Sequence, residues 1–352
     1  GLPAVKIRLR GRLKGSSIAK ACLDADELAS KVEGQSDKQL IRTLKATLAA
    51  ADACLNQQFE QQVDINKLVK ARAWVVEQLI LHAWHNLIPA GENVSLVAVG
   101  GFGRGELHPH SDVDLLILLA ESPPAEALRK AIEDFVTMLW DAGFYLGHSV
   151  RTLETCVSEA KKDIATATSL MESRLLSGSK EMQVAMLDTT SASHVWSAAE
   201  FFDAKYAEQR KRHEQFHGTA YNLEPNIKES PGGLRDIQMI GWVAKRHFGT
   251  QSLHTLVERG FLTESELQDL KDGRTFLWEI RFALHVLAGR GEDRLLFEYQ
   301  RKIAEHFSGV EDSQQSNAAV EQFMQRYYRT VMQNERLNDC LLYTSDAADD
   351  AS

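Results

Sequence analysis

The feature that most constrains this chain is the stretch from Val97 to Leu119, where two apolar runs enclose a loop rich in glycine and arginine. The first run ends at Gly100-Gly101, and the second opens with Asp112 and Asp114. Side chains two positions apart on a β-strand point to the same face, so the two carboxylates would lie side by side. Hard cations such as Mg²⁺ prefer oxygen ligands and usually share them with substrate phosphates. The stretch therefore predicts a strand–loop–strand unit with Asp112 and Asp114 as catalytic metal ligands.

Other residues of this loop fit the binding of a nucleotide triphosphate. Gly100 and Gly101 would let the backbone approach the phosphates without a Cβ in the way. Arg104 adds a positive charge suited to phosphate, and Ser111 adds a hydroxyl. The alternative is a glycine-rich hairpin whose acids only face solvent. Against it, residues 115–119 are all apolar, and acids at the mouth of a buried strand are costly unless they are paired or bound to metal.

Hydrophobic periodicity predicts an α+β protein that is mostly helical. Helical spacing covers 36–62 and 64–88, with Asp64 as N-cap, and returns in 125–141. A third strand is expected over 144–152, and nearly continuous helix after 153. Breaks are expected near 177–178, 218–233, 249–251 and 289–294. The expected domains are an N-terminal helical segment (1–89, loosely held up to 35), a small mixed-sheet nucleotidyltransferase core (90–155), an all-helical domain (156–340) and a disordered tail (341–352).

The expected third strand carries no carboxylate that could join Asp112 and Asp114. His148 or Ser149 could face the site, and Arg151 could hold a phosphate, but a strand histidine is more often simply hydrogen-bonded. Glu106 is a candidate for the missing acid, with a loop-stabilising ion pair to Arg104 as the alternative. His108 and His110 are expected to be turn residues rather than metal ligands.

A second group of candidate residues lies at 221–238. Gly232 and Gly233 form a tight turn before a helix that is expected to end near Phe248, and a helix N-terminus after glycines is a natural anion site. Lys228 and Arg235 flank the turn and could hold a triphosphate or pyrophosphate. Asp236 could supply an additional acid. The alternative is ordinary helix initiation, with Asp236 favourably placed in the first turn.

Composition narrows the class of protein. The chain has 352 residues, is 44% hydrophobic and 25% charged, and carries a net charge of −9, which argues against broad binding to nucleic acid or anionic membranes. The four cysteines are scattered, which indicates neither zinc nor a disulfide framework and fits a reducing cytoplasm. No apolar run approaches the ~20 residues of a membrane span. Because the sequence begins with Gly1, we expect a fragment.

The Val97–Leu119 stretch resembles the polymerase-beta-like nucleotidyltransferase superfamily, whose pattern places Gly-Gly about ten residues before Asp-apolar-Asp-apolar. Across about 70–340 the chain is similar to the bacterial bifunctional PII uridylyltransferase/uridylyl-removing enzymes, at their N-terminal half. This wider resemblance rests on segments such as 147–152, 172–176, 217–225, 228–237, 246–249 and 281–285. It implies Mg²⁺- or Mn²⁺-dependent transfer of UMP from UTP to a tyrosine hydroxyl of the PII signal protein, with release of pyrophosphate.

Three alternatives stay open. Glutamine synthetase adenylyltransferase is similar, but it usually has an acid where this chain has Gln238, and a third acid in the third strand. A non-catalytic nucleotide-sensing module would explain the missing acid. A transferase acting on a small molecule is another possibility. Members of the resembled family continue into an HD hydrolase domain and two ACT domains, which we do not find here, so we expect neither UMP removal nor a response to glutamine.

Overall fold

The computed structural model describes residues 10–91, 93–249, 252–309 and 313–350. The chain divides into two compact units, which we call the sheet unit (up to Val195) and the helical unit (from Trp196 onward). The sheet unit contains α1 (Ser17–Cys22), α2 (Ala25–Val32), α3 (Asp37–Glu60), α4 (Ile65–Leu87), β1 (Val94–Ala98), α5 (Gly100–Gly103), β2 (Val113–Leu119), α6 (Glu126–Asp141), β3 (Leu146–Thr152), α7 (Leu153–Lys162), α8 (Ile164–Met171), β4 (Arg174–Ser177) and α9 (Lys180–Thr189). The helical unit contains α10 (Ala198–Glu214), α11 (Leu234–Phe248), α12 (His254–Glu258), α13 (Glu264–Ala288), α14 (Phe297–Ser308) and α15 (Ser313–Asp350).

The sheet has four strands in the order β3-β2-β1-β4. β1 pairs antiparallel with β2 and with β4, whereas β2 and β3 run parallel and are joined by α6. A parallel pair needs a crossover connection, and α6 provides it. β2 is an inner strand, which explains why its residues 115–119 are all apolar and buried. The expected fold class, mostly helical α+β with a small mixed sheet, is confirmed.

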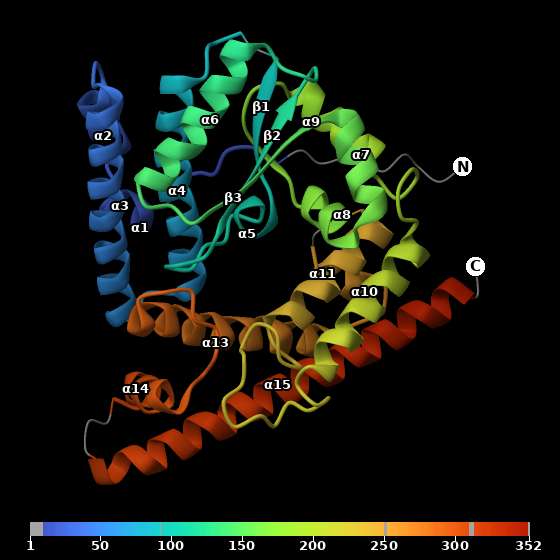
Figure 1. Cartoon of the computed structure of the whole chain (residues 1–352). Coiled ribbons are helices and arrows are strands. Elements are labelled where there is room, and N and C mark those ends of the chain that lie inside the picture. Colours follow the sequence, from blue (N-terminus) through green and yellow to red (C-terminus); the bar gives the residue numbers. More distant parts are fainter. Residues whose placement is uncertain (1–9, 92, 250–251, 310–312, 351–352) are drawn as a thin grey trace. The chain divides into compact units, whose positions relative to one another are not determined.

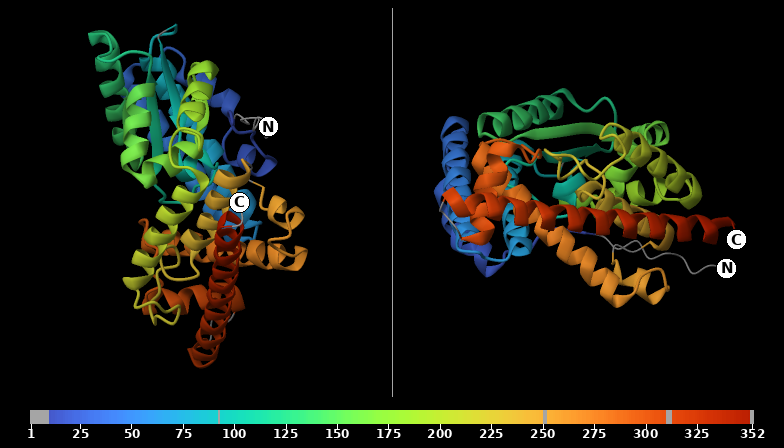
Figure 2. Two further views of the ribbon diagram at one scale, coloured as in Figure 1. Left: turned by 90° about the vertical axis from the view of Figure 1, so that its right-hand side faces the viewer. Right: turned by 90° about the horizontal axis from the view of Figure 1, so that it is seen from below.

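Helices α3, α4 and α6 form the layer beside the sheet (Figure 1). Ser36 and Gln39 make a capping box at the start of α3, and Asp64 caps α4 as expected. α4 is buried along most of its length because it packs against α1, α3 and α6. The helical unit is built around α11, which packs on α10, α13 and α15; α15 is a single long helix in both views of Figure 2.

The described part of the N-terminal lead-in, which we expected to be loosely held, is ordered. α1 and α2 begin after the N-caps Ser16 and Asp24, and their apolar residues Ala19, Leu23 and Leu28 are buried. Both helices pack against α4. Residues 1–9 of the lead-in lie outside the described residues. The expectation failed because helices of six and eight residues carry too few apolar positions to show a period.

Two further expectations about this unit were wrong. Cys22 of α1 and Cys54 of α3 form a disulfide, so the cysteine spacing no longer supports a reducing compartment. The sheet also does not end at 155. Residues 174–177 form β4 beside β1, so the first part of the expected helical domain (156–195) belongs to the sheet unit.

The expected disordered tail was wrong as well, because α15 continues to Asp350. Leu341 and Leu342 are buried, and both line an apolar pocket with residues of α11. These two leucines extend the apolar face of α15, so the packed helix continues into the segment that composition had marked as a tail. Residues 351–352 lie outside the described residues.

Candidate functional site

Asp112 and Asp114 lie at the open end of β2. Asp112 directly precedes the strand and is exposed, and Asp114 is its second residue and is half-buried. Val113 and Leu115, between and after them, are fully buried. This alternation places the two carboxylates on the more open face and the two apolar side chains on the core face, as expected for residues two apart on a strand.

The Asp114 carboxylate lies in close contact with two glycines. Gly147 of β3 is the residue paired with Asp114, and a Cβ there would collide with Asp114 Oδ1. A Cβ at Gly100 would lie 3.1 Å from Oδ2. Gly100 also has φ +60°, which an L side chain rarely adopts. Glycine is therefore required on both sides of this carboxylate. The sequence pattern identified Gly100 but gave no such role to Gly147.

Ser111 fixes the loop that leads into β2. Its Oγ accepts a hydrogen bond of 3.0 Å from the backbone N–H of His108, and its own N–H donates to the His108 carbonyl. The hydroxyl proton of Ser111 can still be donated elsewhere. His108 is buried, and the His110 ring lies edge-on to Tyr145. Burial lowers the pKa of His110, and the charge of Arg72 lowers it further. Both histidines are thus part of the turn.

The register of β3 separates the candidate residues of that strand. In a parallel pair, Gly147, Ser149 and Arg151 share the face of Asp114, and Arg151 lies about 13 Å further along the strand. His148 is on the opposite face, where its ring meets Trp140 of α6. Ser149 rather than His148 is therefore on the side of the two aspartates.

Arg104 is held by two carboxylates. Its Nε donates to Glu106 at 3.0 Å and its Nη1 to Glu172 at 2.7 Å. Burial opposes the charge of Arg104, but Glu172 and Glu106 raise the pKa above its usual value. Glu106 thus forms the ion pair that was the alternative to its role as a third acid. The structure gives Arg104 and Glu106 a part in stabilising the loop, with Glu172 as an unforeseen partner.

The turn before α11 in the helical unit is closed rather than open to an anion. The N–H groups of Leu234 and Arg235 donate to the carbonyls of Ile227 and Lys228, at 3.0 and 2.9 Å. Gly232 has φ +76°, and a Cβ there would collide with the backbone of Val331 in α15. The Gly232 N–H donates to Asp236, and the N–H groups of Gly233 and Asp236 bond within the turn. The glycine turn therefore serves packing, and the expected anion site at this helix start was wrong.

Asp236 is a buried structural acid. Its carboxylate accepts hydrogen bonds from Gln209 and from the Gly232 N–H, and pairs with Arg212 and His213. Desolvation opposes ionisation, yet the hydrogen bond and charge of His213, followed by Arg212, keep the pKa below its usual range. These bonds tie α10 to α11. Asp236 is thus occupied and not a further metal ligand.

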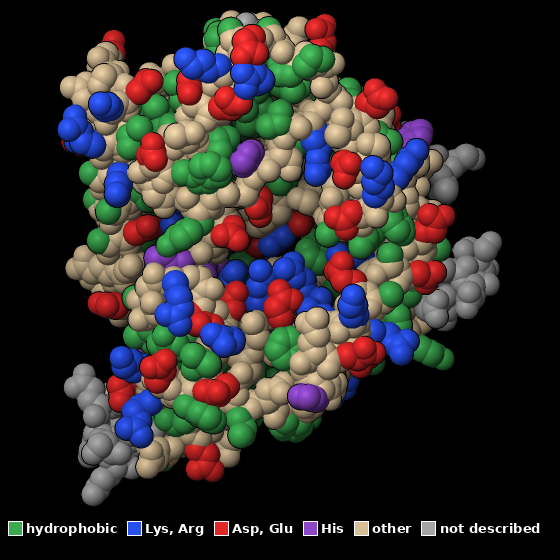
Figure 3. All heavy atoms as spheres, viewed as in Figure 1, with side chains coloured by type: hydrophobic (Ala, Val, Ile, Leu, Met, Phe, Trp, Pro, Cys, Tyr) green, Lys and Arg blue, Asp and Glu red, His purple; other side chains and the backbone are tan. Residues whose placement is uncertain are grey.

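Lys228, Arg235 and Arg281 form the cationic group of the helical unit. Arg281 pairs with Asp293 at 2.9 Å, and Arg235 donates to Glu229 at 3.4 Å. Burial lowers the pKa of Lys228, and the charges of Arg281 and Arg235 lower it further. Lysine and arginine side chains also gather near the centre of the face in Figure 3. A partly desolvated lysine beside two arginines suits a polyphosphate. That this cationic group shares one cleft with Asp112 and Asp114 stays a prediction.

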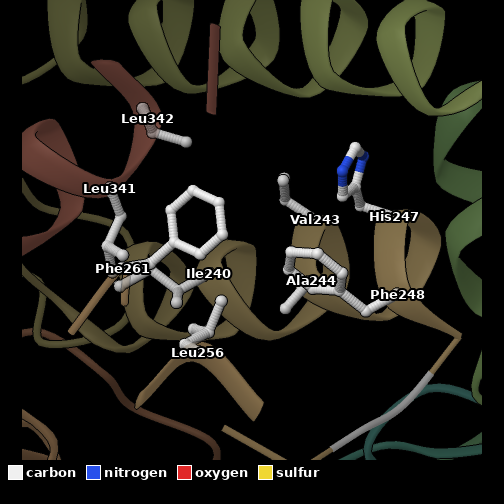
Figure 4. A pocket seen from close by; sticks show the side chains of 9 residues that line it. All are labelled: Ile240, Val243, Ala244, His247, Phe248, Leu256, Phe261, Leu341 and Leu342. Carbon is white, nitrogen blue, oxygen red and sulfur yellow. The ribbon is translucent and has the colours of Figure 1, made fainter. Parts of the chain in front are cut away.

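The helical unit also has an apolar pocket, seen in Figure 4, formed by α11, α12, the segment after α12 and α15. Its lining is Ile240, Val243, Ala244, His247, Phe248, Leu256, Phe261, Leu341 and Leu342. His247 is the one member of this lining with a polar side chain, so the pocket does not suit a nucleotide triphosphate. No predicted site residue takes part in it.

Two absences hold for the described residues. No group of three or more His, Cys, Asp or Glu side chains is arranged to hold a metal ion. None of the described helices is long and apolar enough to cross a membrane.

Comparison with known proteins agrees with this division of the chain. Residues 83–165 match the nucleotidyltransferase domain family, and residues 200–342 match the family described as GlnD PII-uridylyltransferase. Over 303 residues the chain is 48% identical to the bifunctional uridylyltransferase/uridylyl-removing enzyme of Pseudomonas putida (strain F1) and 49% identical to that of Pseudomonas aeruginosa (strain UCBPP-PA14). These alignments cover 86% of this chain and 33% of each relative. The chain spans about a third of the length of these relatives and is similar to them over most of its own length.

Proposed function

We propose that this chain transfers UMP from UTP to a tyrosine hydroxyl of the PII signal protein and releases pyrophosphate. The observation that carries the proposal is the pair of carboxylates at the open end of β2, with Gly100 and Gly147 in close contact with Asp114. PII as the uridylyl acceptor comes from the name of the matched family, and the tyrosine hydroxyl comes from the resemblance found in the sequence. The cytoplasm, predicted from the cysteine spacing as the place of this reaction, stays a prediction, and the Cys22–Cys54 disulfide argues against it.

Asp112 and Asp114 fit a divalent cation. They offer carboxylate oxygens on one face, and the glycines beside Asp114 bring the backbone close to its carboxylate. Mg²⁺ or Mn²⁺ bound there would neutralise charge on the triphosphate and polarise the phosphoryl oxygens. Two carboxylates without a third acid suit an ion that takes its remaining ligands from substrate and water.

The chain's own residues would orient the nucleotide for attack. Gly100 and Gly101 bring backbone close to the phosphates, and the Ser111 hydroxyl can donate to them. The tyrosine oxygen would attack the α-phosphorus, and the bond to pyrophosphate would break on the opposite side. Positioning and charge supply most of the rate in such transfers. In the helical unit, Lys228, Arg235 and Arg281 would hold phosphate oxygens.

The direct test is transfer of labelled UMP from UTP to purified PII in the presence of Mg²⁺. We expect labelled PII with UTP and no label on PII whose acceptor tyrosine is replaced by Phe. Label from ATP but not from UTP would instead support an adenylyltransferase. Binding of UTP without transfer would support a nucleotide sensor, and transfer only to small molecules would support the third alternative.

A further inference from the structure

Arg174 and Glu77 form a buried ion pair behind the glycine loop. Arg174 opens β4, Glu77 lies on α4, and their side chains are 3% and 0% exposed. Glu77 also accepts the backbone N–H of Leu13 at 3.2 Å. A buried pair of this kind is costly to desolvate, so it adds little net stability. Besides pairing with Glu77, Arg174 contacts the neighbouring loop.

Arg174 binds the loop as well as Glu77. Its Nη2 donates to the carbonyl of Phe102 at 2.8 Å, and its Nε donates to the carbonyl of Gly103 at 3.3 Å. The guanidinium also lies 5.1 Å from the centre of the Phe102 ring. The last carbonyls of a helix have no partner within it, and α5 is a single turn. Arg174 binds two carbonyls at this end of α5 in a buried position, and that of Phe102 also accepts the N–H of Gly105.

The segment before Arg174 clamps the same loop. A Cβ at Gly103 would collide with the carbonyl of Glu172, which shows how closely the backbones approach. The Glu172 carboxylate holds Arg104, the next residue of the loop. Residues 172–174 thus contact the loop immediately after Gly100 and Gly101.

We propose that Arg174, held by Glu77, is a positioning residue that keeps Gly100 and Gly101 in place beside Asp114 for nucleotide binding. The inference rests on the proposed function, because it assumes that this loop holds the triphosphate. Arg174 touches neither nucleotide nor metal and acts through the backbone of α5. A lysine keeps the charge but lacks the planar fork that reaches three acceptors at once.

The test compares Arg174→Lys and Glu77→Gln with Leu55→Ala. Leu55 is a buried residue of α3 in the same unit, and its truncation destabilises the unit independently of the loop. Under conditions where all variants are folded, we expect KM for UTP to rise about 10- to 100-fold in the two pair variants. In the same two variants we expect kcat to fall by a smaller factor than KM rises. In Leu55→Ala we expect an unchanged KM. An unchanged KM in folded Arg174→Lys, or an equal rise in Leu55→Ala, would overturn the inference.

A second measurement does not depend on transfer. The N–H groups of Gly103, Arg104 and Gly105 bond within the loop, to Val99, Gly100 and Phe102. In Arg174→Lys their hydrogen exchange should accelerate, while exchange in β2 stays as in the wild type. Equal exchange in the loop would refute the positioning role. If the wild-type protein transfers no UMP, the proposed function fails, and the exchange result still decides whether Arg174 holds the loop.

Discussion

The chain contains two Gly-Gly pairs, one in each unit, that look alike in sequence and differ in the structure. Gly100 of the first pair lies against the carboxylate of Asp114, whereas Gly232-Gly233 is buried against the backbone of α15 and of its own turn. The first pair permits close approach to an acid, and the second permits close packing of backbone on backbone. A glycine pair before a helix therefore indicates close approach of backbone, and only the neighbours decide whether the approaching group is a ligand or another helix.

The largest expected effect concerns Asp112 and Asp114, the two aspartates near the first glycine pair. Replacing Asp112 and Asp114 together by Asn should lower UMP transfer by about a thousandfold or more, because the charge that binds the cation is lost. Thermal unfolding should stay nearly unchanged, since Asp112 is exposed and Asp114 half-buried. Transfer to PII and a melting curve measure both effects. Retained transfer in the double variant would exclude this site.

A single alanine substitution in each glycine pair tests this difference. Gly232→Ala should destabilise the helical unit by about 3 kcal/mol or more, because φ is +76° and the Cβ would meet Val331. Gly101→Ala places its Cβ 3.3 Å from the Glu106 carbonyl and should cost about 1 kcal/mol while reducing transfer. Denaturant unfolding and activity distinguish the two. Similar losses of stability in both variants would contradict the difference between the two glycine pairs.

The disulfide should make the two units differ in their response to reductant. Cys22 and Cys54 are separated by 32 residues, so closing that loop stabilises the sheet unit by about 4 kcal/mol. The described part of the helical unit contains one cysteine, Cys340, and no disulfide. Reduction, or the substitution Cys22→Ser, should lower the melting temperature of the sheet unit alone. A shift in the helical unit of the same size would contradict this.

The smallest effect concerns the cationic group. Lys228→Met should raise KM for UTP about tenfold, as expected for one charged contact to phosphate. Since the ammonium form binds phosphate and burial lowers the pKa of Lys228, affinity should fall with rising pH earlier than for an ordinary lysine. Lys228→Arg should remove that pH dependence. Lys211→Met, at an exposed lysine of α10, is the control. An unchanged KM in Lys228→Met would remove this group from the site.

Much of the fold was predictable because its signals are local. The long helices α3, α4 and α6 showed both periodicity and helix-terminating residues, and β2 was recognisable as an apolar run after Asp112 and Asp114. β4 was not, because four residues without alternation become a strand only through pairing with β1. The start of α11 has the sequence of an anion site, and only the carbonyls of Ile227 and Lys228 show otherwise.

The residues that support the glycine loop could not be predicted from the sequence, because their partners lie far away along the chain. Glu77 and Arg174 are 97 positions apart, and nothing in either segment indicates that they meet. Glu172 and Arg104 are 68 positions apart. Gly147 has a signal in principle, since a glycine within a strand often marks close approach of another group. That signal gains meaning only once the register places Gly147 opposite Asp114.

The position of Gly147 also has a consequence for how the site is assembled. On the face of Asp114, β3 offers no side chain at 147, a hydroxyl at Ser149 and, further along, a positive charge at Arg151. On this face of β2 and β3 the negative charge therefore comes from Asp112 and Asp114, and two carboxylates fill only part of the coordination sphere of Mg²⁺. Bare cations would bind weakly to the resting protein. The ion would instead arrive as a complex with the triphosphate, so nucleotide concentration would govern metal occupancy.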